Sequence, residues 1–200
     1  VVELIADIEP LYFDHSERLK AKDADSIEAV FRGLVLTGVA MTLVGTSTPA
    51  SGGEHLVSHA LDMMSSVDHE PHDLHGRQVG VGTILTAELY RRILEIEKPE
   101  VVVPTVMVDG DFWGDLASMV ESEYAKKRDR LDGAFERIQH AETWDRVRSS
   151  VARYLKAPEA IRECLSKAGG ACGASDLGMD RERLLAAFLH GHEIRSRFTV

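Results

Sequence analysis

Apolar positions recur with a helical period along most of this chain. The clearest case is residues 76–98, where one face repeats at about 3.6-residue spacing; it consists of Val81, Leu85, Leu89, Ile93 and Ile96. Further helices are expected after the Ser51-Gly52-Gly53 turn and over residues 112–140, 142–155, 157–169 and 181–198. The pattern predicts one all-α domain over residues 1–200, with about seven to nine helices.

Residues 25–45 form another expected helix, and Asp25 with Glu28 resembles a capping box at its start. The run over residues 30–45 is the most apolar in the chain. It is interrupted by Arg32 and is shorter than a bilayer requires. We therefore expect a buried core helix rather than a membrane span.

Two other segments have distinct patterns. Residues 98–110 have strand-like chemistry bounded by prolines, which predicts an extended connector or a short edge strand. Asp180 is placed to cap the last helix, and the positions expected to face inward there are Leu184, Leu185, Phe188 and Leu189. Trp113 and Trp144 are expected in the core, and the charged residues 121–137 on a solvated face.

Composition narrows the class of protein. The net charge is −10, which argues against nucleic-acid binding. Two cysteines make no disulfide framework, so a reducing cytoplasmic location is expected, with no membrane partner. Neither end carries a clear start or stop signal for its helical pattern, so we expect a fragment of a longer polypeptide.

The candidate chemistry lies in three histidines. His55 and His59 are one helical turn apart and share a face. His75 follows a loop long enough to fold back, so the three imidazoles are expected to converge and to bind a transition metal. Glycines 52, 53 and 76 would allow close approach. Surface or core histidines are the alternative, and His72-Asp73 is similar to the metal pair of HD-type phosphohydrolases.

Two dense motifs carry a resemblance to a known family. "PASGGEHLVSHALD" (49–62) followed by "LHGRQVGVGTIL" (74–85) resembles the metal-binding half of sn-glycerol-1-phosphate dehydrogenases. These belong to the iron-containing alcohol dehydrogenase and dehydroquinate synthase superfamily. The final "HEIRSRFTV" is similar to that family's last helix. The resemblance implies the C-terminal helical domain of the dehydroquinate synthase-like fold, without the N-terminal α/β nucleotide-binding domain.

The resemblance also implies residue roles. His55 and His75 would be metal ligands, for zinc or alternatively iron or nickel. His59 would contact substrate and handle a proton as the catalytic residue. Ser51 and Gly52 would shape the substrate pocket. The substrate would be a small phosphorylated polyol or ketose, with NAD(P) bound mainly by the absent domain and a homo-oligomer as a further possibility.

The chain departs from the family pattern in three places. Many members carry an arginine before P-A-S-G, where this chain has Thr48, and this puts the substrate in question. The interval from His55 to His75 is longer than in compact members, and it adds His69 and His72. The third metal ligand of the family is an aspartate in a G-x-x-D stretch that this sequence lacks.

The function implied is therefore part of an NAD(P)-dependent dehydrogenase that reversibly reduces dihydroxyacetone phosphate, with the fragment alone expected to be inactive. Asp7 and Asp14 do not match the missing ligand's motif. A dehydroquinate synthase-like cyclase is one alternative, although it would carry G-H-[AT]-[IL]-E in place of S-H-A-L-D. A non-enzymatic helical domain is another.

Packing or solvated roles are expected for the histidines and arginines near the C-terminus, His190, His192, Arg195 and Arg197. The two arginines are also candidate phosphate contacts.

Overall fold

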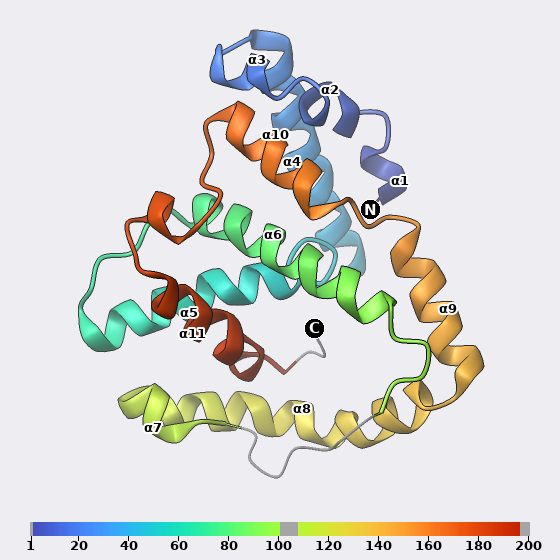
Figure 1. The fold of residues 1–200 in the computed structure, drawn as a ribbon, viewed down its shortest axis with the longest axis vertical. Helices are drawn as coiled ribbons and strands as arrows, with labels where there is room; N and C mark the ends of the chain where they lie inside the picture. The colour runs from blue at the N-terminus through green and yellow to red at the C-terminus, as the bar shows by residue number, and fades with distance from the viewer. Residues whose placement is uncertain (1, 101–107, 197–200) are drawn as a thin grey trace.

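The computed structural model describes residues 2–100 and 108–196, and every regular element in these ranges is a helix (Figure 1). The elements are α1 (Val2–Ile5), α2 (Glu9–Phe13), α3 (Glu17–Lys20), α4 (Ala24–Val44), α5 (Gly53–Asp68), α6 (His75–Leu94), α7 (Gly110–Trp113), η1 (Gly114–Leu116), α8 (Ala117–Ile138), α9 (Ala141–Ala152), α10 (Pro158–Ala168), η2 (Ala174–Leu177), α11 (Arg181–His190) and η3 (Gly191–Ile194). The all-α prediction is confirmed. The extended segment predicted at 98–110 falls largely outside the described residues, as does Arg197.

Helices α5 and α6 form the centre of the molecule. They lie side by side in Figure 1, joined by the short connection 69–74, so they run in opposite directions. Helix α11 and η3 pack on α5, and α8 packs on η3. The core between these elements includes Leu61, Val81, Trp113, Val120 and Ala187, all almost fully buried. Trp144 is also buried, so the core prediction for both tryptophans is confirmed.

The start of α4 differs from the predicted capping box. Asp23, not Asp25, is the N-cap, and its Oδ1 accepts hydrogen bonds from the backbone N–H and the hydroxyl of Ser26. Asp25 lies in the first helical turn. The reason is that Asp23 adopts the extended backbone that an N-cap needs, two residues earlier than the pattern indicated.

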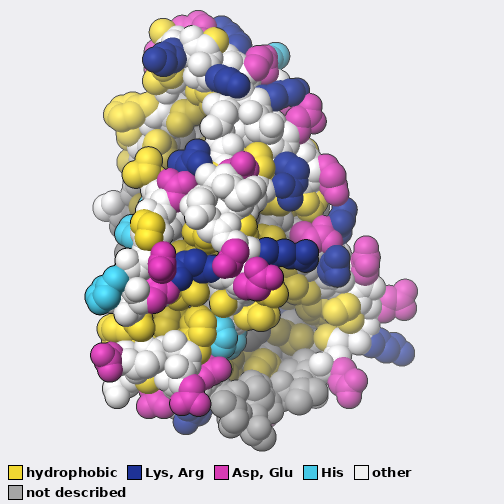
Figure 2. Space-filling model, turned by 60° about the vertical axis from the view of Figure 1, so that its left-hand side comes forward, with side chains coloured by type: hydrophobic (Ala, Val, Ile, Leu, Met, Phe, Trp, Pro, Cys, Tyr) yellow, Lys and Arg dark blue, Asp and Glu magenta, His cyan; other side chains and the backbone are white. Residues whose placement is uncertain are grey.

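The prediction that α4 is a buried core helix is wrong. Phe31, Leu34 and Leu43 are 65%, 66% and 77% exposed. Helices α1 to α3 pack on α4, and they leave these three apolar side chains exposed. Among the described helices, α4 alone has the length and composition to cross a bilayer. A single such helix near the N-terminus is weak evidence for a membrane span, because core helices and signal sequences have the same properties. Figure 2 shows that hydrophobic side chains are also exposed elsewhere, between belts of charged ones.

The last helix is capped as predicted, because Asp180 Oδ1 accepts the backbone N–H of Arg183 at 2.7 Å. Its expected inward face is only partly right. Leu184 is buried and Phe188 packs against the core, but Leu185 and Leu189 are about half exposed. Leu185 borders a groove between α6 and α11, and Leu189 borders a second groove lined by α5, α6, α11 and η3.

A buried polar cluster links α7 and α8 to the C-terminal part of the described chain. The carboxylate of Glu193 accepts hydrogen bonds from Trp113 Nε1 at 2.7 Å and from the Asp109 backbone N–H at 3.0 Å, and it contacts His190 Nδ1 at 2.7 Å. Lys127 is also buried and donates to the His192 carbonyl. The solvated face expected over 121–137 therefore fails at Lys127, because η3 covers it.

Candidate metal centre

The three predicted histidines converge. The imidazole centroids of His55 and His75 are 5.3 Å apart, those of His59 and His75 are also 5.3 Å apart, and those of His55 and His59 are 6.5 Å apart. His55 and His59 stand on successive turns of α5, while His75 is the first residue of α6. The fold-back of the connection 69–74 brings them together, as the sequence predicted.

His55 is oriented by the residue before it. Its Nδ1 lies 2.8 Å from Glu54 Oε1, which also accepts the backbone N–H of Gly52 at 2.8 Å. Burial raises the pKa of Glu54, but the hydrogen bonds from His55 and Gly52 outweigh this and lower the pKa overall. An ionised Glu54 accepts a hydrogen bond from His55 Nδ1–H, which leaves the Nε2 lone pair of His55 available to a ligand.

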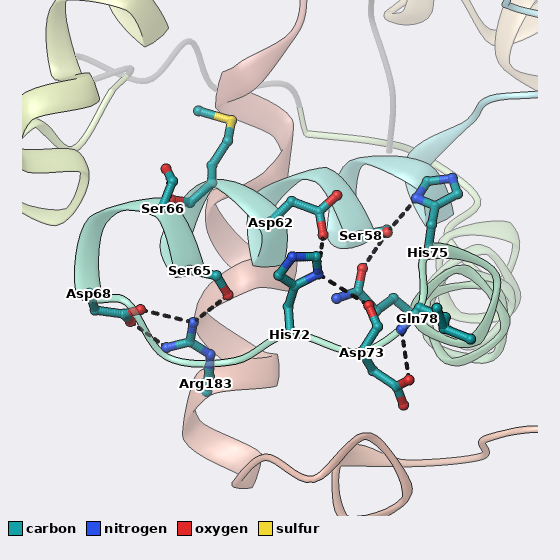
Figure 3. Close-up of polar contacts among 12 residues, drawn as sticks. Ser58, Asp62, Ser65, Ser66, Asp68, His72, Asp73, His75, Gln78 and Arg183 are labelled. Carbon is teal, nitrogen blue, oxygen red and sulfur yellow. Dashed lines mark hydrogen bonds and ion pairs between the residues drawn. The ribbon is translucent and has the colours of Figure 1, made fainter.

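The exposed His75 is oriented by two buried side chains, Ser58 of α5 and Gln78 of α6 (Figure 3). Its Nδ1 lies 2.8 Å from Ser58 Oγ, and Ser58 donates to Gln78 Oε1 at 2.6 Å. A hydroxyl has one proton, so Ser58 accepts from His75 Nδ1–H, and the Nε2 lone pair of His75 is again the available one. Contacts of this kind fix the tautomer and ring orientation of metal-binding histidines.

His59 faces a cavity of about 350 Å³. The walls consist of His59, Asp62, Met63, Met119, Val120, Glu123, Ile194 and Arg195. Burial lowers the pKa of His59, and the nearby Arg195 guanidinium lowers it further, although Asp62 opposes this. The lowered pKa favours the neutral form of His59, which lies beside a small cavity lined by the Arg195 guanidinium and the carboxylates of Asp62 and Glu123. Arg195, expected in a packing or phosphate role, lies on this wall.

Asp62 is the residue that the sequence reasoning missed. One ligand atom each of His59, Asp62 and His75 lies within 4.8 Å of the other two. His72 Nδ1 is 3.1 Å from Asp62 Oδ1, so the longer connection reaches the rim of the centre (Figure 3). Asp62 follows His59 by three residues and His55 by seven, a spacing that shares one helical face and could have revealed it. Asp73 instead bonds Arg77 and the Leu74 backbone at the start of α6, so it is paired away from the centre.

The glycines have separate roles. A Cβ at Gly52 would lie 2.6 Å from Glu54 Oε2, so the close approach expected there is found. At Gly76 a Cβ would meet nothing within 4 Å, so no protein group approaches there, and the approach of a substrate or cofactor stays a prediction. The tightest backbone approach is at Gly82, where a Cβ would lie 2.6 Å from the Glu54 carbonyl oxygen. Ser51 lies in the turn just before α5, at the same end as His55.

Comparison with known proteins assigns a family to this all-helical chain. No family model matches the chain. The glycerol-1-phosphate dehydrogenase [NAD(P)+] of Geobacillus stearothermophilus is 30% identical over 194 residues, covering 94% of this chain and 40% of that protein. The enzyme of the same name from Bacillus subtilis is 23% identical over 186 residues, covering 93% of this chain and 38% of that protein. The enzyme of that name from Methanococcoides burtonii is 45% identical over 80 residues, covering 40% of this chain and 21% of that protein.

The chain belongs to the glycerol-1-phosphate dehydrogenase family, of which it represents the helical, C-terminal part. It spans about two fifths of the length of the curated relatives that it matches along most of its own length. Those relatives carry a dehydrogenase name, which favours the dehydrogenase over the cyclase alternative.

Proposed function

We propose that this chain forms the metal-binding part of an NAD(P)-dependent dehydrogenase that interconverts dihydroxyacetone phosphate and sn-glycerol 1-phosphate. The observation that carries the proposal is the meeting of His55 and His75, each with Nδ1 engaged by the protein and Nε2 left available. A packing role needs no such matched orientation, whereas a metal site does.

His55 and His75 would hold the metal, with an aspartate outside this chain as the third protein ligand. Zinc is the proposed ion, with iron or nickel as alternatives, because imidazole suits all three. The bound metal would act as a Lewis acid on the substrate oxygen at the reacting carbon, and a nicotinamide would exchange hydride there.

The residues of the chain would bind and orient the substrate. His59, neutral and at the cavity wall, would hold a substrate hydroxyl and exchange a proton through its imidazole. The turn at Ser51 and Gly52 would close the pocket beside His55. Arg195 would offer the positive charge that a phosphorylated polyol or ketose requires. It would take the place of the arginine that many family members carry before the P-A-S-G motif, where this chain has Thr48.

NAD(P) would be bound mainly by protein outside this chain, so we expect the 200-residue chain alone to be inactive. The location that we propose is the cytoplasm.

A second copy of the chain is the partner that we propose for the exposed face of α4, because a twofold axis would pair Phe31 and Leu34 with their equivalents. Sedimentation velocity of the protein and of Leu34→Glu tests this: a variant that associates as strongly as the parent contradicts it.

Steady-state kinetics test the main proposal. A chain extended to the length of the relatives should oxidise NADH or NADPH when given dihydroxyacetone phosphate, and His55→Gln or His75→Gln should abolish both turnover and bound metal. His59→Gln should keep the metal and lose turnover. Stoichiometric metal that persists in the double variant His55→Gln/His75→Gln would exclude the assignment.

A further inference from the structure

Arg195 stands at the cavity beside His59 because of where η3 ends. It is the first residue after η3 and has an extended backbone. Both residues line the same cavity, and after burial the Arg195 guanidinium is the main cause that lowers the pKa of His59. A long side chain reaches a given point reliably only if its Cα is held in place. The path of η3 therefore decides where this positive charge lies.

A buried carboxylate holds η3 from the side of α7. Glu193 is 4% exposed, and its Oε2 accepts hydrogen bonds from Trp113 Nε1 at 2.7 Å and from the Asp109 backbone N–H at 3.0 Å. Its Oε1 lies 2.7 Å from His190 Nδ1. Helix α7 and the residue that caps it thus fix the third residue of η3, two positions before Arg195.

A buried ammonium group holds η3 from the side of α8. Lys127 is 4% exposed, and its Nζ donates a hydrogen bond to the His192 carbonyl oxygen at 3.0 Å. Burial lowers the pKa of Lys127 and the Glu193 carboxylate opposes this change, so the two charges act on each other. The His192 carbonyl and the Glu193 side chain are consecutive fixed points on the backbone that leads to Arg195.

A third contact sets the start of η3 against α5. A Cβ on Gly191 would lie 3.3 Å from the Leu56 carbonyl oxygen, so this residue packs directly on the α5 backbone. Leu56 lies between His55 and His59 in α5. Helix η3 contacts both α5 and α8, and it lies between them in Figure 1. One end of η3 therefore rests on the helix that carries His59, and the other end leads to Arg195.

Stability alone does not account for the two buried charges. Taking an ammonium group and a carboxylate out of water is expensive, and well-packed apolar side chains of similar volume are often as stable or more so. The charged groups supply direction, because each binds a particular backbone or ring atom. An apolar pair would fill the same space but would permit more than one path for η3.

We infer that Lys127 and Glu193 are positioning residues for the substrate phosphate, which they affect by holding Arg195 at the cavity. The inference rests on the proposed function for the phosphate contact of Arg195. Neither side chain is part of the cavity wall, and both act on η3 rather than on the α5–α6 pair. The phosphate end and the metal end of the site thus have separate supports.

A double-mutant cycle in the enzyme extended to the length of the relatives tests the inference. Lys127→Met removes the ammonium group and keeps an unbranched side chain, and Arg195→Met does the same for the guanidinium. Steady-state kinetics give KM for dihydroxyacetone phosphate and Ki for inorganic phosphate as a competitive inhibitor. Lys127→Met should raise both by about 10-fold and change kcat by less than about 3-fold, because a misplaced binding group weakens recognition. In the Arg195→Met background it should change them by less than about 2-fold.

Matched variants control for charge and folding. Arg130→Met removes a positive charge from an exposed position of the same helix and should leave KM and Ki as in the parent. Glu193→Gln should repeat the pattern of Lys127→Met, so a folding defect in one variant leaves the other to decide. Far-UV circular dichroism checks that each variant is folded, and the metal content should equal that of the parent in all of them.

The possible outcomes are distinct. If Lys127→Met and Glu193→Gln both behave like Arg130→Met, the inference is overturned and the proposed function stands. Equal losses with and without the Arg195 guanidinium would mean that Lys127 acts on phosphate through its own charge, which also overturns the inference. An unchanged Ki in Arg195→Met would contradict the phosphate contact of the proposed function itself, and the inference would fall with it.

Discussion

Gly82 of α6 lies against the backbone of Glu54 in α5, so closely that a Cβ on Gly82 would sit 2.6 Å from the Glu54 carbonyl oxygen. Backbone atoms cannot rotate aside as a side chain does, so this contact sets the separation of the two helices. His55 follows Glu54, and His75 begins the opposite helix two turns before Gly82. The distance between the histidines therefore depends on a glycine that bears no functional group.

Gly82→Ala should force α5 and α6 apart. Overpacking of this kind costs about 1–3 kcal/mol, and we expect a lower midpoint in urea together with weaker Zn²⁺ binding. Gly76→Ala is the control, because a Cβ there meets nothing within 4 Å and alanine favours the helix. Equal stability of the two variants would show that the close contact does not set the helix spacing.

Ser58→Ala should affect both stability and the metal site. Ser58 and Gln78 are fully buried, and removal of the hydroxyl leaves Gln78 without its partner. The cost should be about 1–3 kcal/mol. Freeing the His75 ring should weaken metal binding by about 10–100-fold. Ser66→Ala, at an exposed position on the same helix, should change neither the unfolding free energy nor the affinity.

Glu193→Gln should destabilise the fold without touching the metal site. An amide offers one acceptor oxygen where the carboxylate now serves Trp113, Asp109 and His190. We expect a loss of about 2–3 kcal/mol in chemical denaturation. Glu182→Gln, exposed in the first turn of α11, is the comparison. A loss no larger than that of Glu182→Gln would mean that the cluster contributes little.

Stability should fall in acid partly through Glu54. Its folded-state pKa lies below the ordinary value of 4.5, so its contribution is complete above 4.5 and is lost as the pH falls through the lowered value. Glu54→Gln should be less stable than the parent at neutral pH, and the difference should shrink below pH 4.5. Thermal unfolding of both proteins across that range measures it, and a constant difference would speak against this origin.

Helix periodicity predicted most of the fold because it reports directly which side of a helix is apolar. It predicted α5, α6, α9 and α10 within a few residues, and it predicted the start of α11, although α11 ends at His190 and not at 198. It also placed His55, His59 and His75 together. It failed at α4, where an apolar run identifies a helix but not what covers it. It also failed at Asp62 and Lys127, because charged residues in an amphipathic pattern are read as solvated. Only the tertiary contacts show that η3 buries Lys127 and that Asp62, about a third exposed, lies beside His59 and His75.

All the side chains at the candidate metal centre, apart from Ile194, Arg195 and the α8 wall of its cavity, lie between Ser51 and Gln78. The centre therefore forms when two consecutive helices close on each other, without waiting for distant parts of the chain. An ion bound there would hold α5 and α6 together early in folding. Loss of the metal should accordingly speed unfolding of the hairpin more than it changes the packing of α9 or α10.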